Sequence, residues 1–269
     1  GFDATSEGLE APVVKKDVGV DDQEDELLDG EERTKYRALA ARANYSAMDR
    51  LDIQFATKEL RRNMANPKAS SWLKLKRLAR YLLEHPRLEW EFQCSGEVVP
   101  ALEVFSDSNG GGCRTSRKST SGGEIVLGGG ASKSWSSAQA TIATSSGEAE
   151  LYALTKAAAV GLGIQALAAD LGWQLGVRVW VDSSAAKSIA SRQGLGRARH
   201  LEVKYLWVQE AVRAGRFEVR KVAGIQNPAG LVTKPHGVRQ ASAVLEAIGG
   251  VLRRRGGLPC RPRWAESDD

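Results

Sequence analysis

Two kinds of apolar pattern divide this 269-residue chain near residue 93. Before that point, apolar residues recur every three or four positions, the spacing that places them on one face of a helix. One such face consists of Trp72, Leu75, Leu78, Ala79 and Leu82. Residues 31–92 are therefore predicted to form a small helical segment.

After residue 93 the pattern changes to short strands that alternate with helices. Strands are predicted over residues 102–107, 124–127, 133–137, 178–182 and 217–222. Helices are predicted over residues 145–171, 183–191, 200–214 and within 238–249. Three strands followed by alternating helices and strands is the plan of an α/β domain with a mixed sheet, which we assign to residues 93–250.

Charge is distributed unevenly around a formal net charge of +5. Residues 1–35 carry 12 acidic and 4 basic side chains, so the remainder of the chain is strongly basic. Residues 1–30 show no apolar period and are predicted to be a disordered acidic arm, and residues 251–269 a basic disordered tail. The basic body favours binding to nucleic acid, because neutralised phosphates release counterions. A solvated basic surface accounts for the same charge.

The composition also argues against several classes of protein. Charged residues interrupt the apolar stretches, so no membrane span or membrane partner is expected. Cys94, Cys113 and Cys260 are far apart and match neither a zinc site nor a disulfide framework. Free cysteines are typical of a reducing compartment, so we expect an intracellular protein of the cytoplasm or nucleus.

Three carboxylates occupy positions typical of a divalent-metal site. Asp107 and Asp182 each close an apolar strand before a turn rich in Gly or Ser. Glu150 falls on the apolar face of the helix predicted over 145–171, where a carboxylate is costly unless it is paired or bound to a cation. Hard divalent cations prefer such oxygen ligands. Taken singly, each Asp can also be a turn cap, and Glu150 a residue tolerated near a helix end.

Glu148 lies two residues before Glu150 and faces a different direction on the helix. The spacing Ser145-x-x-Glu148 matches a capping box, in which the Glu side chain reaches back to the amide of the N-cap residue. We therefore interpret Glu148 as structural and Glu150 as functional.

Six sequence blocks resemble the ribonuclease H domain of copia-type LTR retrotransposon Pol polyproteins. In chain order they are FSDS at 105–108, RKSTSG at 117–122, SSGEAELYAL at 145–154, VDSSAA at 181–186, RHLEVKY at 199–205 and LVTKP at 231–235. Residues 36–92 resemble the segment that links the reverse transcriptase to ribonuclease H in the same polyproteins. The resemblance covers about three quarters of the chain.

The resemblance implies a five-stranded mixed sheet flanked by helices and hydrolysis of the RNA strand of an RNA–DNA hybrid by two Mg²⁺ ions, with Mn²⁺ as a substitute. Other parts of a Pol polyprotein are implied as partners. The catalytic and metal-binding residues would be Asp107, Glu150 and Asp182. The residues that contact nucleic acid would be Arg117, Lys118, Ser119 and Thr120.

The fourth carboxylate of the family is missing. It lies in a motif Ala-Asp-x-Leu-Thr-Lys-Pro, which here begins Ala229-Gly230, so Gly230 replaces the Asp. Asn227 could supply one neutral oxygen in its place. Two functions therefore stay open: a ribonuclease H impaired at its second ion, or a catalytically degenerate module that still binds nucleic acid. A transposon fragment without a selected role is a third reading.

Overall fold

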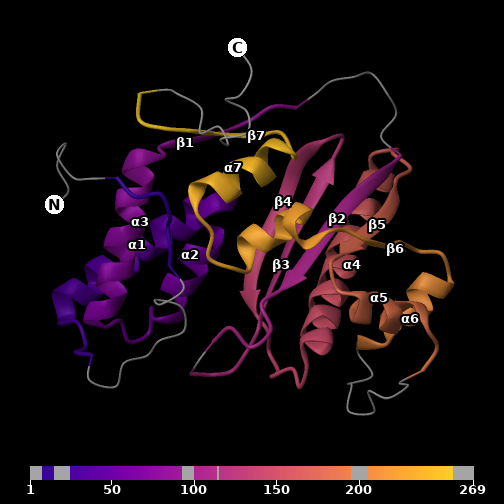
Figure 1. Ribbon diagram of the computed structural model, residues 1–269, viewed down its shortest axis with the longest axis horizontal. Coiled ribbons are helices and arrows are strands. Elements are labelled where there is room, and N and C mark those ends of the chain that lie inside the picture. Colours follow the sequence, from indigo (N-terminus) through magenta and orange to yellow (C-terminus); the bar gives the residue numbers. More distant parts are fainter. Residues whose placement is uncertain (1–7, 15–24, 93–99, 114, 195–204, 257–269) are drawn as a thin grey trace. The chain divides into compact units, whose positions relative to one another are not determined.

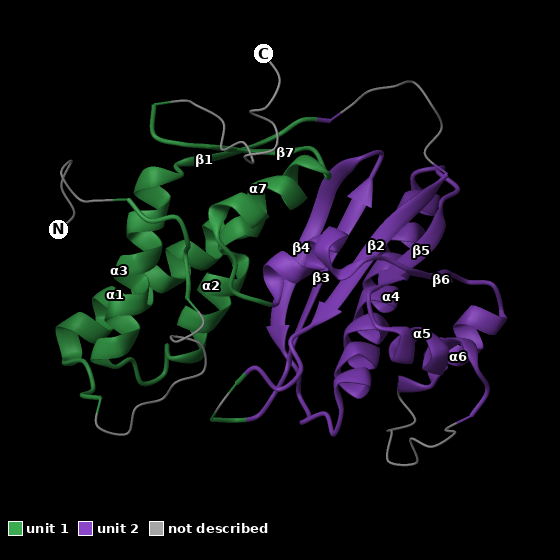
Figure 2. Ribbon diagram, in the orientation of Figure 1, with its two compact units in different colours: residues 1–91, 113–116, 234–269 green, residues 92–112, 117–233 purple. Residues whose placement is uncertain are grey.

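The computed structural model describes residues 8–14, 25–92, 100–113, 115–194 and 205–256. These residues form two compact units (Figure 2). Unit 1 combines the chain up to Glu91 with Cys113–Ser116 and the chain from Lys234 onward. Unit 2 combines Phe92–Gly112 with Arg117–Thr233. Segments from both ends of the chain therefore share unit 1.

Among its described residues, unit 1 contains helices, three of which share one apolar core, and a small antiparallel sheet. Its elements are α1 (Gly30–Ser46), α2 (Leu51–Arg62), α3 (Ala69–Glu84), α7 (Val238–Glu246), β1 (Arg87–Trp90) and β7 (Gly250–Arg253). Asp29 caps α1 by accepting a hydrogen bond from the Glu32 amide at 2.7 Å. Tyr36 is fully buried in the core and donates to the Leu60 carbonyl oxygen at 2.9 Å. Its burial raises the pKa of its hydroxyl to about 12.

The predicted helical segment, the predicted basic tail and the predicted acidic arm are each wrong over part of their residue range. Residues 87–90 form strand β1 rather than helix, and residues 251–253 belong to strand β7 rather than to a disordered tail. The two strands pair in register from Arg87↔Arg253 to Trp90↔Gly250. Because they lie more than 150 residues apart in sequence, a local sequence pattern does not predict that they pair. The acidic arm contributes buried Val13 and Leu28 to the core of unit 1. Residues 1–7, 15–24 and 257–269 of the predicted arm and tail lie outside the described residues.

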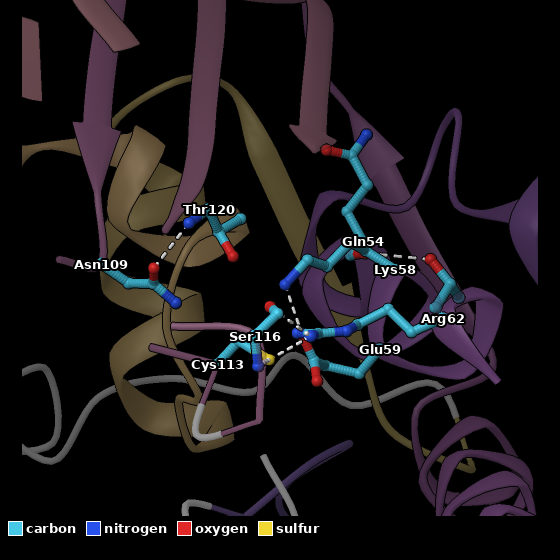
Figure 3. Close-up of polar contacts among 9 residues, drawn as sticks. Gln54, Lys58, Glu59, Arg62, Asn109, Cys113, Ser116 and Thr120 are labelled. Atoms are coloured by element: carbon cyan, nitrogen blue, oxygen red, sulfur yellow. Dashed lines mark hydrogen bonds and ion pairs between the residues drawn. The ribbon is translucent and has the colours of Figure 1, made fainter. Parts of the chain in front are cut away.

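A polar cluster joins α2 to the short segment Cys113–Ser116 within unit 1 (Figure 3). Arg62 donates to the buried Cys113 sulfur and, at 3.4 Å, to the Ser116 hydroxyl. Burial by itself raises the pKa of the Cys113 thiol, but hydrogen bonds from Ser116 and Arg62 outweigh it, and the pKa is lowered. Beside them, Lys58 and Glu59 form a buried ion pair. These contacts attach the short segment to the helix.

Unit 2 contains a five-stranded mixed sheet in the order β4-β3-β2-β5-β6 (Figure 1). Its elements are β2 (Ala101–Ser108), β3 (Thr120–Leu127), β4 (Gly130–Ala138), α4 (Ser146–Asp170), β5 (Gly176–Val181), α5 (Ser184–Ser191), α6 (Trp207–Arg213), β6 (Glu218–Lys221), η3 (Gly224–Gln226) and η4 (Pro228–Val232). β2, β3 and β4 are antiparallel neighbours, whereas β2–β5 and β5–β6 are parallel. The predicted α/β class with a five-stranded mixed sheet is confirmed. The predicted helix over 200–214 is described only from Tyr205 onward, and His200 lies outside the described residues.

Helix α4 packs on one face of this sheet. Its Leu154, Ala157 and Ala158 share a buried core with Val104 of β2 and Val179 of β5. The approach is close at Gly161, where a Cβ would lie 2.9 Å from a methyl group of Val104. A larger residue at this position would push the helix away from the sheet.

The expectation that charged residues break up every long apolar stretch is wrong for α4. Among the described helices, α4 is long and apolar enough to cross a membrane, with no charged residue between Lys156 and Asp170. Its apolar face instead contacts the sheet, and half of its most apolar window is buried inside the protein. A helix that covers the centre of a sheet needs such a composition.

A buried carboxyl group lies on the opposite face of the sheet. Ile125 of β3 faces α4, so its neighbour Glu124 points to the other face, opposite Phe105 of β2. The Glu124 side chain is 1% exposed, and its Oε2 has no hydrogen-bond partner among the described residues. Burial raises the pKa of this carboxyl well above its ordinary value. Folding therefore keeps a proton on Glu124 that the unfolded chain releases.

We expect Glu124→Met to remove a pH-dependent loss of stability. Between the unfolded pKa of about 4.3 and the raised folded pKa, the native protein binds the extra proton, so its stability falls as pH rises through this range. The loss is about 1.4 kcal/mol for each pH unit crossed, and it stops growing once pH exceeds the folded pKa. Urea unfolding from pH 4 to pH 8 should show a flatter profile and a higher free energy of unfolding at pH 8. The exposed Glu246→Met is the control, and an unchanged slope for Glu124→Met would contradict the assignment.

Candidate metal and nucleic-acid site

Three carboxylates meet at one edge of the sheet in unit 2. Asp107 lies near the end of β2, Asp182 directly follows β5, and Glu150 lies in the second turn of α4. One ligand oxygen from each lies within 4.8 Å of the other two. Asp107 is fully buried, whereas Glu150 and Asp182 are partly exposed. The residues singled out from the sequence are thus brought together.

The topology explains why these distant residues converge. β2 and β5 are parallel neighbours, with Ser106 opposite Val181, so Asp107 and Asp182 leave the sheet at the same edge. The N-terminus of α4 lies at that edge too: a Cβ on Gly110 would be 3.8 Å from Ser146, and one on Gly147 would be 3.1 Å from Ala185. The first two turns of α4 therefore lie beside the ends of both strands.

The electrostatics of this arrangement favour a divalent cation. Two unit negative charges 4.8 Å apart repel by about 3.5 kcal/mol at an effective dielectric constant of about 20. Lys221 donates to the backbone carbonyl oxygen of Asp182, not to its carboxylate. All three ligands are oxygens, the donor type that hard cations such as Mg²⁺ prefer. The donor set therefore fits a divalent metal site.

Glu148 does not face this cluster. Its carboxylate accepts hydrogen bonds from the Thr144 amide at 2.7 Å, from the Thr144 hydroxyl at 2.6 Å and from the Tyr152 hydroxyl. The Ser145 hydroxyl in turn accepts from the Glu148 amide at 3.2 Å. The cap thus differs from the expected capping box by one residue, because the carboxylate reaches Thr144 rather than Ser145. The pKa of the Tyr152 hydroxyl is raised, mainly because it is buried and secondly because it donates a hydrogen bond to Glu148.

The short helix η4 covers the face of the sheet opposite α4, next to Asp107. Asn227 caps η4 by accepting from the Ala229 amide at 3.2 Å and donates to the Ser106 carbonyl oxygen at 2.9 Å. Both ends of its amide are therefore engaged, which argues against the expected role of Asn227 as a substitute metal ligand. Thr233, at the other end of η4, donates its hydroxyl proton to Asp107.

Gly230 lies between these two contacts on η4. A Cβ at this position would have no atom within 4 Å, and Gly230 is not among the glycines with positive φ. Neither packing nor backbone conformation requires glycine there. Gly230 thus lacks the carboxylate expected from the resemblance, and among the described residues no packing constraint explains the glycine.

The four residues expected to contact nucleic acid divide into two pairs. Ser119 and Thr120 are buried and hold the connection between β2 and β3: the Ser119 hydroxyl accepts from Gly111 at 2.7 Å, and the Thr120 amide donates to Asn109 at 2.6 Å (Figure 3). Arg117 is exposed, with a φ of 56°, a conformation uncommon for a residue other than glycine. Lys118 is partly exposed.

Sequence comparisons relate the chain to transposon polyproteins. It is 29% identical over 187 residues to the retrovirus-related Pol polyprotein from transposon TNT 1-94 of Nicotiana tabacum, which is 69% of this chain and 14% of the relative. It is 29% and 28% identical over 206 residues, 75% of this chain, to the Pol polyproteins from transposons RE2 and RE1 of Arabidopsis thaliana. The chain spans 14% of the length of these curated relatives. The resemblance to retrotransposon Pol polyproteins is confirmed, although no family model matches the chain.

Two solved ribonuclease H structures resemble part of the chain. One is the N-terminal RNase H domain of Rv2228c from Mycobacterium tuberculosis, with a TM-score of 0.37, 16% identity, and coverage of 55% of this chain and 98% of that domain. The other is LC11-RNase H1, isolated from compost by a metagenomic approach, with a TM-score of 0.37, 16% identity, and coverage of 49% and 92%. The fold class itself rests on the strand order and pairing described above.

We expect the two helix glutamates to behave oppositely on substitution. Glu148→Gln should lower the free energy of unfolding by about 1–3 kcal/mol, because hydrogen bonds to a buried charge are lost. Glu150→Gln should leave stability unchanged or raise it in metal-free buffer, because it removes one charge from a repulsive cluster. Denaturant unfolding with chelator measures both, and Mn²⁺ titration should show weakened binding only for Glu150→Gln. The reverse ranking would mean that the metal ligand is the other glutamate.

Proposed function

We propose that this chain is a retroelement ribonuclease H that hydrolyses the RNA strand of an RNA–DNA hybrid with divalent metal ions. The observation that supports it best is the convergence of Asp107, Glu150 and Asp182 within 4.8 Å. The homology to Pol polyproteins and the five-stranded mixed sheet agree with this activity. Mg²⁺ is the proposed ion, and Mn²⁺ its substitute.

The chain's own residues prepare the site for this reaction. Asp107, Glu150 and Asp182 would hold the cation by their oxygens, and the Thr233 hydroxyl donates to Asp107 from the side of η4. A bound cation would activate water and neutralise charge that develops on the scissile phosphate. Arg117 and Lys118 offer positive charge to the nucleic-acid backbone.

A second function is favoured by Gly230. Two ions about 3.5–4 Å apart need flanking carboxylates to offset their repulsion. With Gly230 in place of the fourth carboxylate, one ion would be held well and the other poorly. The chain would then bind hybrids through the same basic surface with little turnover, as a degenerate remnant of a Pol polyprotein.

Cleavage of a labelled RNA–DNA hybrid decides between these functions. The full chain is incubated with Mg²⁺ or Mn²⁺, and Asp107→Asn serves as the inactive control. RNA cleavage that depends on metal and is lost in Asp107→Asn supports the enzyme. Hybrid binding without any cleavage in either metal supports the remnant, and the absence of both contradicts the proposed function.

We expect Gly230→Asp to raise Mg²⁺-dependent hybrid cleavage at least tenfold, about 1.4 kcal/mol in the barrier. The substitution restores a carboxylate where the space is open and φ is not positive, so it should not destabilise the fold. Initial rates at millimolar Mg²⁺ measure the effect, and Gly230→Asn is the matched variant without charge. Equal rates for wild type, Gly230→Asp and Gly230→Asn would show that the fourth carboxylate is dispensable here.

Binding of the hybrid should depend steeply on salt if the exposed basic residues contact phosphates. Each phosphate contact adds about −0.9 to the slope of log affinity against log salt on a B-form duplex. Arg117→Ala and Lys118→Ala should each reduce the slope by about 1, without regard to sequence. Fluorescence anisotropy in chelator measures this, with exposed Arg33→Ala of α1 as control. A flat salt dependence in wild type contradicts the assignment.

A further inference from the structure

The side chain of Thr233 is held in one place above the sheet. Asp107 of β2 and Gly122 of β3 are directly paired in the strand register. The Thr233 hydroxyl donates to Asp107 Oδ2. On the other partner, a Cβ at Gly122 would lie 2.5 Å from the Thr233 methyl carbon Cγ2. Thr233 therefore contacts both members of the pair, one with its hydroxyl and one with its methyl group.

This packing selects the direction of the hydroxyl proton. Thr is branched at Cβ, so placing its methyl group against Gly122 fixes the position of its hydroxyl oxygen. Two carbonyl oxygens, of Ala229 and Gly230, also lie 3.3 Å from that oxygen, but the contact with Asp107 is shorter than either. The hydroxyl has one proton to donate. The proton therefore lies toward Asp107.

This hydrogen bond involves a carboxylate of the candidate metal site. Thr233 and Asp107 are both fully buried, and Asp107 belongs to the carboxylate cluster. The hydroxyl is neutral, so its hydrogen bond can orient the Asp107 carboxylate without bringing a positive charge that would repel a metal ion. A Lys or Arg in the same place would compete with the cation.

The segment that carries Thr233 is itself fixed to β2. Asn227, at the start of η4, donates to the carbonyl oxygen of Ser106, the residue before Asp107. η4 is thus attached to two consecutive residues of β2, by Asn227 at one end and by Thr233 at the other. The glycine at 122 is what permits this approach, because a Cβ there would also lie 2.5 Å from a methyl carbon of Val232.

We propose that Thr233 is a positioning residue of the metal site: it holds the Asp107 carboxylate in one orientation for cation binding. Its role as an aid to catalysis rests on the proposed function, but its effect on cation binding is measured without any cleavage. Gly122 is also required for this arrangement, since it leaves room for the Thr233 methyl group.

The test is titration of the full chain with Mn²⁺, with free Mn²⁺ measured by electron paramagnetic resonance. Thr233→Val keeps the shape and removes the hydroxyl, and should weaken Mn²⁺ binding at least fivefold. Thr233→Ser keeps the hydroxyl and should stay within about twofold of wild type. Thr155→Val is the matched control, because the buried Thr155 hydroxyl donates only to the Leu151 carbonyl at 2.8 Å in the described structure. It should bind as wild type does.

Two results would overturn the proposal. One is wild-type Mn²⁺ affinity in Thr233→Val, and the other is an equal loss in Thr233→Val and Thr233→Ser, which would exclude the hydroxyl as the cause. If Thr233→Val does not fold, Thr233→Ala replaces it, because it removes the hydroxyl without adding volume.

A wild-type chain that binds no Mn²⁺ would count against the proposed function instead. A double-mutant cycle in chelator then decides the positioning role separately. Thr233→Val should lower the unfolding midpoint of the wild-type chain more than that of the Asp107→Ala variant, because the hydrogen bond exists only in the former. Equal shifts would overturn the role of Thr233.

Discussion

The mutual repulsion of three carboxylates is the constraint on which the rest of unit 2 depends. Asp107, Glu150 and Asp182 would separate if their backbones were mobile, because nothing in a metal-free cluster attracts them to one another. Two parallel strands and the end of a long packed helix hold the backbones instead. The energy for this comes from the apolar core between α4 and the sheet, which explains why α4 is apolar over most of its length.

Several charged side chains of unit 2 have hydrogen-bond or ion-pair partners outside the cluster. Glu148 is occupied by Thr144 and Tyr152, and Lys221 by the backbone of Asp182. Arg178 of β5 pairs with Glu103 of β2 at 2.8 Å. This ion pair lies four strand residues, about 13 Å, from Asp107, too far to neutralise the cluster. None of these contacts is an ion pair with a carboxylate of the cluster.

The strands and the long helix could be predicted from sequence because their apolar periods are local. The distinction between Glu148 and Glu150 could also be drawn locally, from which face of the helix each occupies. By contrast, the pairing of β1 with β7 depends on residues at opposite ends of the chain, and short stretches such as Gly250–Arg253 have no strong period. The contacts of Thr233 could not be predicted from sequence, because they depend on Gly122, more than a hundred residues earlier in the chain. The buried state of Glu124 has no sequence signal, because an alternating strand normally turns such a residue to solvent.

The residue at position 230 can change the metal ligands of the site without changing the contacts that hold η4 in place. η4 is attached to β2 by Asn227 and Thr233, and neither contact involves the side chain at residue 230. A substitution from Asp to Gly at this position can therefore remove a metal ligand without loosening the segment that carried it. The same applies to folding, because neither packing nor backbone conformation requires a particular side chain at residue 230. The fold, the three-carboxylate cluster and the exposed basic residues can therefore persist in a chain whose fourth carboxylate is absent.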